Sequence, residues 1–197
     1  PHGGLGVLLG GVPGVDPAKV VILGGGVVGS HACHIALGMG AEVWVLDRSV
    51  EVLRSLWRQF GRPLNTVFST HDALENHVTS ADLVIGGVLI PGASAPKLVS
   101  AALVKRMKPG SVIVDLAAET GGNCELTVAG ENAVKYGVLL MGPVNVPASL
   151  PFHAFFAVAL MATDSVIAQE YYGILARPWG PSQLDDQTGG SAFAWAF

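Results

Sequence analysis

Three glycines and one carboxylate give this sequence its clearest chemical signature. Gly24, Gly26 and Gly29 form the pattern G-x-G-x-x-G, and Asp47 follows Gly29 by 18 residues. The first glycine allows a tight turn, the second lets a pyrophosphate approach the backbone, and the third lets a helix pack closely on a strand. A carboxylate at the distance of Asp47 can accept hydrogen bonds from ribose hydroxyls. These residue types and their spacing predict a dinucleotide-binding site.

The residues around the glycines supply the elements that such a site requires. Val20–Leu23 is a continuous apolar run typical of a buried strand, Val27–Met39 suits a helix, and Val43–Leu46 is a second apolar run that ends at Asp47. The helix would direct its unpaired N–H groups and the positive end of its dipole at the phosphates. A glycine-rich turn in an unrelated α/β domain is the alternative, but it leaves the acid after the second strand unexplained.

The rest of the chain alternates strands and helices. We expect helices at Val50–Phe60, Asp72–Val78 and Ala101–Met107, and strands at Thr66–Phe68, Ala81–Gly86, Ser111–Leu116 and Val138–Met141. This alternation predicts an α/β fold with a doubly wound parallel sheet of the Rossmann type and the strand order 3-2-1-4-5-6. We expect one dinucleotide-binding domain over residues 1–176 with a long helix at about 149–175, followed by an irregular tail at 177–197.

In this strand order the carboxyl ends of the strands lie around one crevice. The crevice falls at the switch between the first and fourth strands, which is the point where the strand order reverses direction. Five segments follow strand ends and converge there: the Gly24 turn, Asp47, the Val88–Pro91 loop, Glu119 and Asn145. This convergence favours a functional role for Glu119 over that of a solvated loop carboxylate. Asn145 could equally be a turn residue.

Other conspicuous residues have simpler interpretations. Asp115 can cap the loop after its strand, and Lys97 can be either a surface cation or a phosphate contact. His31, Cys33 and His34 have no second ligand pair at a zinc spacing, so we expect no metal.

The composition suits a sheet buried on both faces, because 50% of the residues are hydrophobic and 13% are charged. The net charge is −4 and no basic cluster indicates nucleic acid.

The longest apolar stretch, Phe152–Ala162, is too short to span a bilayer, and no secretory signal is present. Cys33 and Cys124 lie far apart, and no disulfide is expected. We expect a soluble, cytoplasmic protein whose sequence is an excised segment of a longer one.

Six segments carry a more specific resemblance: Gly6–Val15, Val20–Gly29, Ala36–Asp47, Ala81–Val99, Met107–Glu125 and Pro143–Pro151. Together they resemble the dinucleotide-binding domain shared by bacterial alanine dehydrogenases and the α subunit of proton-translocating nicotinamide nucleotide transhydrogenase. The resemblance implies NAD as the cofactor. It also implies an oxidoreductase that transfers hydride between the nicotinamide and a small amino or oxo acid such as alanine or pyruvate.

The two families differ along the chain. The segments GVLLGGVPGV and LIPG resemble alanine dehydrogenase, whereas DLAAETGGNCELT and GPVNVPASLP resemble transhydrogenase. Transhydrogenases carry a long loop between the third and fourth strands, where this chain has only His71–Ser80. The short connection favours alanine dehydrogenase, and transhydrogenase with its membrane partner is the alternative.

The resemblance also implies roles for individual residues. The implied cofactor-binding residues are Gly24, Gly26, Val27, Val28, Gly29, Asp47, Arg48, Ser69, Val88, Leu89, Leu116, Asn145 and Val146. Of these, Asp47 would bind the adenosine ribose, Ser69 would lie near the adenine, and Val88 and Leu116 would line the nicotinamide side. Glu119 falls where alanine dehydrogenases place a catalytic Asp, and Asn145 falls where they place an Asn beside the nicotinamide and substrate.

Glu119 keeps the charge of the family's Asp but adds a methylene group. The family's remaining catalytic residues, an Arg, a Lys and a His, belong to an N-terminal substrate domain that has no counterpart in this chain. We therefore expect a missing substrate domain, a homo-oligomer, and a chain that binds NADH without turning over alanine alone.

Overall fold

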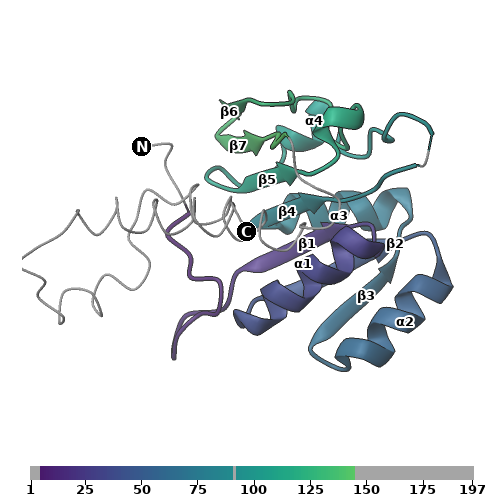
Figure 1. The fold of residues 1–197 in the computed structure, drawn as a ribbon. Helices are drawn as coiled ribbons and strands as arrows, with labels where there is room; N and C mark the ends of the chain where they lie inside the picture. The colour runs from purple at the N-terminus through teal and green to yellow at the C-terminus, as the bar shows by residue number, and fades with distance from the viewer. Residues whose placement is uncertain (1–4, 91, 145–197) are drawn as a thin grey trace, which may run out of the picture. The chain divides into compact units, whose positions relative to one another are not determined.

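The computed structural model describes residues 5–90 and 92–144, which belong to one compact unit spanning Gly3–Val146. Figure 1 shows an open sheet with helices on its faces. In chain order the elements are β1 (Lys19–Leu23), α1 (Val27–Gly38), β2 (Glu42–Asp47), α2 (Val50–Phe60), β3 (Leu64–Phe68), α3 (His71–Ser80), β4 (Leu83–Gly86), α4 (Ala101–Val104), β5 (Val112–Asp115), the 3₁₀ helix η1 (Ala118–Thr120), β6 (Asn132–Lys135) and β7 (Val138–Met141).

The sheet has seven strands in the order β3-β2-β1-β4-β5-β7-β6. All neighbours are parallel except β6, which runs antiparallel to β7. The predicted α/β fold is confirmed, and the six predicted strands lie in the predicted order. The switch between β1 and β4 stands at the middle of the sheet.

The central strand β1 is buried on both faces, which explains its unbroken apolar sequence. Val21 and Leu23 belong to a core cluster that includes Leu74 and Val78 of α3 and Leu103 of α4. On the opposite face, the Ile22 side chain lies beneath Gly29 of α1. In Figure 1, α1 and α2 lie in front of the sheet and α3 lies behind it.

Side-chain caps begin two of the helices directly after strand ends. The Ser49 side chain accepts a hydrogen bond from the Val52 N–H at 3.3 Å at the start of α2. The Thr70 side chain accepts one from the Ala73 N–H at 3.1 Å at the start of α3. These caps satisfy N–H groups that a helix end leaves unpaired, and they position both helix starts at the carboxyl edge of the sheet.

One predicted helix is shorter than expected, and one strand was not predicted. The predicted helix Ala101–Met107 ends at Val104, because the following N–H groups of Arg106 and Met107 bond three residues back, and Pro109 lacks an N–H to extend a helix. The strand β6 was not predicted because it is short, mostly exposed, and only two of its four residues are apolar. A two-residue turn, Tyr136 (φ 55°) and Gly137 (φ 79°), joins it to β7. Positive φ at both positions is typical of a tight hairpin.

Three expectations concern residues outside those that the structure describes. They are the helix at about 149–175, the domain boundary at 176 and the tail at 177–197. None of the described helices combines the length and apolar character needed to cross a bilayer. Within residues 5–90 and 92–144, no three His, Cys, Asp or Glu side chains are grouped as a metal would require. Cys33 and Cys124 are buried free thiols.

Candidate dinucleotide site

The first and third glycines of the motif serve close packing. Gly24 has a φ of +92°, and its N–H donates to the Leu46 carbonyl at 2.8 Å, which joins the ends of β1 and β2. A Cβ on Gly24 would lie 2.9 Å from Cγ2 of Val88. A Cβ on Gly29 would overlap the Gly24 carbonyl oxygen. The lack of a side chain at Gly29 therefore lets α1 rest on the turn, and the lack of one at Gly24 lets Val88 approach the same turn.

Gly26 differs from both of these glycines. It is exposed, its φ is −67°, and a Cβ placed on it would meet nothing within 4 Å. It precedes α1, which has no side-chain cap and no acidic residue in its first turn. The start of α1 therefore combines open space with N–H groups that no capping side chain serves, which suits a phosphate.

Asp47 ties the glycine turn to the next two strand ends. Its Oδ2 accepts from the Gly25 N–H at 2.7 Å, and its Oδ1 accepts from the Ser49 N–H at 2.7 Å. Its backbone carbonyl accepts from the Ser69 N–H at 2.9 Å. A carboxylate offers about four acceptor positions. These two bonds orient Asp47 and leave acceptor capacity for ribose hydroxyls.

The loop after β4 lies against the glycine turn. The Gly87 N–H donates to the Leu23 carbonyl at 2.9 Å, and a Cβ on Gly87 would lie 3.3 Å from Cγ1 of Val28. Val88 is half-buried beside Gly24, whereas Leu89 is 50% exposed. The loop after β4 thus lies beside the Gly24 turn and the start of α1, with Val88 near Gly24 and Gly87 near Val28.

Asp115, the last residue of β5, and Glu119, four residues later, lie in different surroundings. Asp115 is buried, with Oδ1 accepting from the Ala117 N–H at 3.1 Å and Oδ2 accepting from the Cys124 N–H at 2.9 Å. The interpretation of Asp115 as a loop cap is confirmed. Glu119 is exposed on η1, where the Thr120 carbonyl accepts from the Ala95 N–H at 2.8 Å. Of these two carboxylates, Glu119 is therefore the one that is accessible to a ligand.

The remaining predicted residues lie in several positions. Ser69 is half-buried after β3, Leu116 donates its N–H to the Gly86 carbonyl at 2.9 Å, and Arg48 and Val27 are exposed. Asn145 and Val146 lie outside the described residues.

Sequence reasoning missed Asn123 and left the role of Lys97 open. Asn123 is buried, and its side chain bonds both backbone groups of Val88. The Lys97 amine donates to the Gly121 carbonyl and to the Cys124 carbonyl, the latter at 3.0 Å. Lys97 thus ties the loop after β4 to the segment after β5. The sequence feature that could have indicated Asn123 is its place in Gly121-Gly122-Asn123-Cys124, where a polar side chain stands between two glycines and a cysteine.

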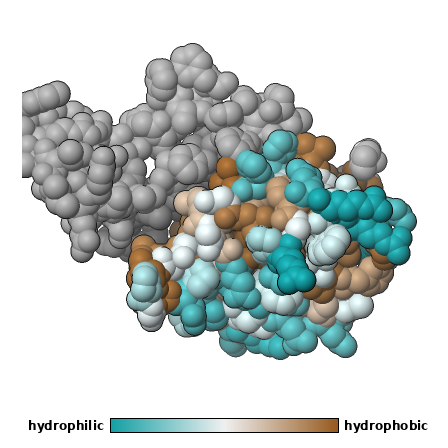
Figure 2. Space-filling model, turned by 90° about the horizontal axis from the view of Figure 1, so that it is seen from below, coloured by the Kyte–Doolittle hydropathy of each residue, from teal (hydrophilic) through white to brown (hydrophobic). Residues whose placement is uncertain are grey.

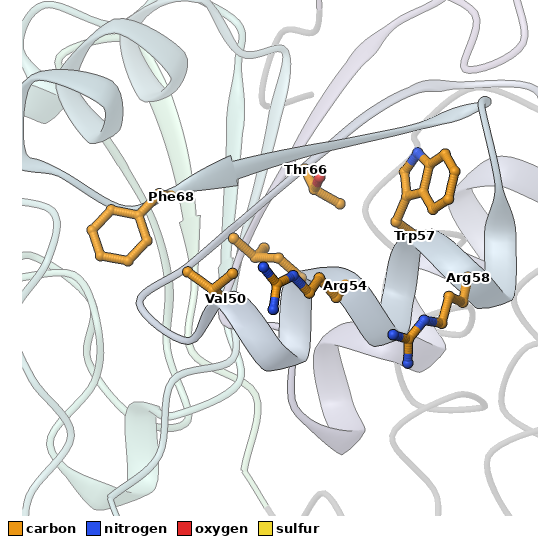
Figure 3. A pocket seen from close by; sticks show the side chains of 7 residues that line it. Val50, Arg54, Trp57, Arg58, Thr66 and Phe68 are labelled. Carbon is orange, nitrogen blue, oxygen red and sulfur yellow. The ribbon is translucent and has the colours of Figure 1, made fainter.

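A separate hollow of about 510 Å³ lies between α2 and β3, lined by Val50, Leu53, Arg54, Trp57, Arg58, Thr66 and Phe68. Figure 3 shows that α2 contributes both arginines and that Phe68 lies at the end of β3. In Figure 2, hydrophobic and hydrophilic residues are interspersed over the described part of the visible face. The hollow shares no residue with the predicted dinucleotide site.

Comparison with known proteins identifies the family. The model of the family described as alanine dehydrogenase/PNT, C-terminal domain, matches residues 1–170, and the chain belongs to this family. The alanine dehydrogenase of Halomonas elongata is 49% identical over 189 residues, which cover 94% of this chain and 50% of that protein. The alanine dehydrogenase of Mycobacterium tuberculosis is 48% identical over 160 residues, which cover 79% of this chain and 43% of that protein.

Two solved structures place the fold in the same superfamily. An L-alanine dehydrogenase matches with a TM-score of 0.71 and 39% identity, over 96% of this chain and 58% of that one. The transhydrogenase from Sinorhizobium meliloti matches with a TM-score of 0.63 and 35% identity, over 70% of this chain and 40% of that one. The chain spans about half the length of the curated relatives it matches.

Proposed function

We propose that this chain is the NAD(H)-binding part of an alanine dehydrogenase that transfers hydride between the nicotinamide and an alanine or pyruvate type of substrate. The arrangement at Gly26 carries the proposal. The space in front of α1 is open there, and Asp47 is held beside the same turn by the Gly25 N–H at 2.7 Å. N–H groups that can donate to a phosphate and a carboxylate that can accept from a ribose thus lie on one turn, which is what a dinucleotide requires.

Each predicted residue has a place in this proposal. The pyrophosphate would lie at Gly24–Gly29 and the start of α1, with the adenosine ribose at Asp47 and the adenine near Arg48 and Ser69. The nicotinamide would lie on the opposite side of the β1–β4 switch, against Val88, Leu89 and Leu116, with Asn145 and Val146 beside it. The bound NAD supplies the hydride chemistry, and the protein positions it.

Glu119 is the proposed acid–base group, because it is the first exposed carboxylate after the carboxyl end of β5. A general acid or base must come within about 2.6–3.2 Å of the reacting atom or act through one water. Asn145 would orient the nicotinamide and the substrate from the loop after β7.

The alternative is the NAD(H)-binding domain of a transhydrogenase α subunit, which would have a membrane partner. The connection between β3 and β4 favours alanine dehydrogenase, since α3 (His71–Ser80) accounts for nearly all of it. The substrate domain, the homo-oligomer, the cytoplasmic location and the domain organisation proposed from the sequence belong to the same proposal.

The test separates binding from turnover in the 197-residue chain. We expect micromolar-range or tighter NADH binding by calorimetry and no alanine-dependent NADH production in a steady-state assay. Without a substrate clamp the reactants are unoriented, which forfeits a proximity term of roughly 7–11 kcal/mol. The longer protein that contains the chain should oxidise alanine. Absence of NADH binding would refute the proposal, and alanine oxidation by the chain itself would show that it contains a substrate site.

A further inference from the structure

Asn123 lies beside a part of the chain that has left the sheet and has no neighbouring strand to bond its backbone groups. Strand β4 ends at Gly86, and two residues later the N–H and carbonyl of Val88 have no neighbouring strand. The Val88 N–H donates to Asn123 Oδ1 at 2.9 Å, and Asn123 Nδ2 donates to the Val88 carbonyl at 2.9 Å. One side-chain amide thus pairs with both groups of Val88, as a strand neighbour would.

The Asn123 side chain is itself held firmly. It is 1% exposed, and its Nδ2 also donates to the Pro96 carbonyl at 3.1 Å. Its backbone carbonyl accepts from the N–H groups of Leu98 at 2.8 Å and Val99 at 2.9 Å. The amide orientation is therefore determined by three side-chain bonds and a fixed backbone, so it can impose a position on Val88.

The position imposed on Val88 matters because the fit against the glycine turn is tight. The Val88 Cγ2 atom lies 2.9 Å from where a Cβ on Gly24 would stand, and the Gly87 N–H is bonded to β1. Asn123 thus fixes the backbone of Val88, whose side chain lies against the Gly24 turn.

We infer that Asn123 is a positioning residue for the nicotinamide half of the bound dinucleotide. The inference rests on the proposed function, since Val88 belongs to the nicotinamide wall only if the cofactor lies across the β1–β4 switch. Asn123 does not touch the cofactor in this proposal. It holds the wall on which the nicotinamide ring rests. Its hydrogen bonds go to Val88, Pro96, Leu98 and Val99, whereas Asp47 is oriented by the N–H groups of Gly25 and Ser49.

The test compares two ligands that differ in the nicotinamide alone. The variant Asn123→Asp keeps the size and the acceptor toward the Val88 N–H, but it loses both N–H donors and places carboxylate charge against the Val88 and Pro96 carbonyls. Calorimetric titration of the 197-residue chain should show NADH binding weakened about tenfold, equivalent to roughly 1.4 kcal/mol. Binding of ADP-ribose, which lacks the nicotinamide, should change by less than about twofold, equivalent to roughly 0.4 kcal/mol.

The matched control is Asn65→Asp, which removes a comparable amide bond to the Val43 carbonyl at 3.2 Å between β2 and β3. Both affinities should be unchanged in this variant. If Asn123→Asp does not fold, Asn123→Ser provides the same comparison, because its hydroxyl retains one donor and one acceptor.

The outcomes are distinct. A selective loss of NADH binding supports the positioning role. Equal losses for NADH and ADP-ribose would assign Asn123 a purely structural role, and unchanged NADH binding would remove Val88 from the nicotinamide wall. Failure of the unaltered chain to bind either ligand would overturn the proposed function itself.

Discussion

The two glycines that flank the start of α1 offer a sharp test, because they have opposite surroundings in one motif. Gly26 has a φ of −67°, which any residue can adopt, and a Cβ there meets nothing within 4 Å. A Cβ on Gly29 would overlap the Gly24 carbonyl oxygen. We therefore expect Gly26→Val to remove nucleotide binding from a folded protein, and Gly29→Ala to damage the fold.

The expected effect of Gly26→Val on stability is small. Gly26 is the N-cap of α1, and exchanging a favourable N-cap residue for an apolar one costs about 0.5–2 kcal/mol. Replacing glycine also stiffens the unfolded chain, which offsets roughly 0.4–1 kcal/mol where the native conformation is compatible. The free energy of unfolding should therefore fall by no more than about 1.6 kcal/mol, which is the difference between the largest cost and the smallest offset.

The expected effect of Gly26→Val on binding is larger. An anion at a helix N-terminus gains up to about 2 kcal/mol, and an isopropyl group in front of α1 would exclude the phosphate from that position. Losing this term alone would weaken NADH binding by up to about 30-fold. In Gly29→Ala, overpacking at the turn costs about 1–3 kcal/mol of stability, and binding declines because the turn is displaced.

Thermal unfolding and calorimetric NADH titration of both variants measure these two quantities. The reasoning predicts a near-normal melting temperature with lost binding for Gly26→Val, and a lowered melting temperature for Gly29→Ala. A folded Gly26→Val variant with unchanged NADH affinity would show that the phosphates do not lie at this turn.

Three further predictions concern cofactor choice, the cysteines and pH. NADPH should bind at least about tenfold more weakly than NADH, because the Asp47 carboxylate would repel a 2′-phosphate; equal affinities in parallel titrations would contradict the assigned role of Asp47. Burial raises the pKa of the Cys33 thiol to about 12, and Cys124 is also buried, so a thiol reagent near pH 8 should label neither until the chain unfolds; rapid labelling of the native protein would count against this packing. Burial and the nearby Lys19 cation lower the pKa of His77 below its usual 6.5. Protonation therefore favours the unfolded chain, and the free energy of unfolding should decrease as the pH falls below about 6.5. Urea titrations of the His77→Gln variant should show a weaker dependence of this free energy on pH.

The architecture was predictable because the strands carry their signal in a few adjacent residues. Four consecutive apolar residues at Val20–Leu23 indicate a strand buried on both faces, and the structure buries all four. The edge strand β6 carries no such signal, since only Ala133 of its four residues is even partly buried. The feature that marks this hairpin is the Tyr136-Gly137 turn, where both residues have positive φ. A hydrophobic pattern does not reveal such a turn, because it depends on the backbone conformation.

The candidate site was predictable to a lesser degree, because sequence position does not reveal hydrogen-bond partners. Asp115 and Glu119 are four residues apart after the same strand, and both carry a carboxylate. Only the fold shows that Asp115 is used by the N–H groups of Ala117 and Cys124, whereas Glu119 is exposed. Asn123 was missed for the same reason, since its bonds reach Val88, 35 residues earlier in the chain.

These hydrogen bonds make the loops after β4 and β5 one mechanical unit. Asn123 binds Val88 and Pro96, Lys97 binds two carbonyls of the later segment, and the Ala95 N–H bonds the Thr120 carbonyl. The adenosine side is organised separately, through the two backbone N–H groups that orient Asp47. A change in one of these units should therefore alter one half of the dinucleotide site more than the other. That separation is why two ligands that differ only in the nicotinamide can distinguish a residue that positions the nicotinamide from one that supports the whole fold.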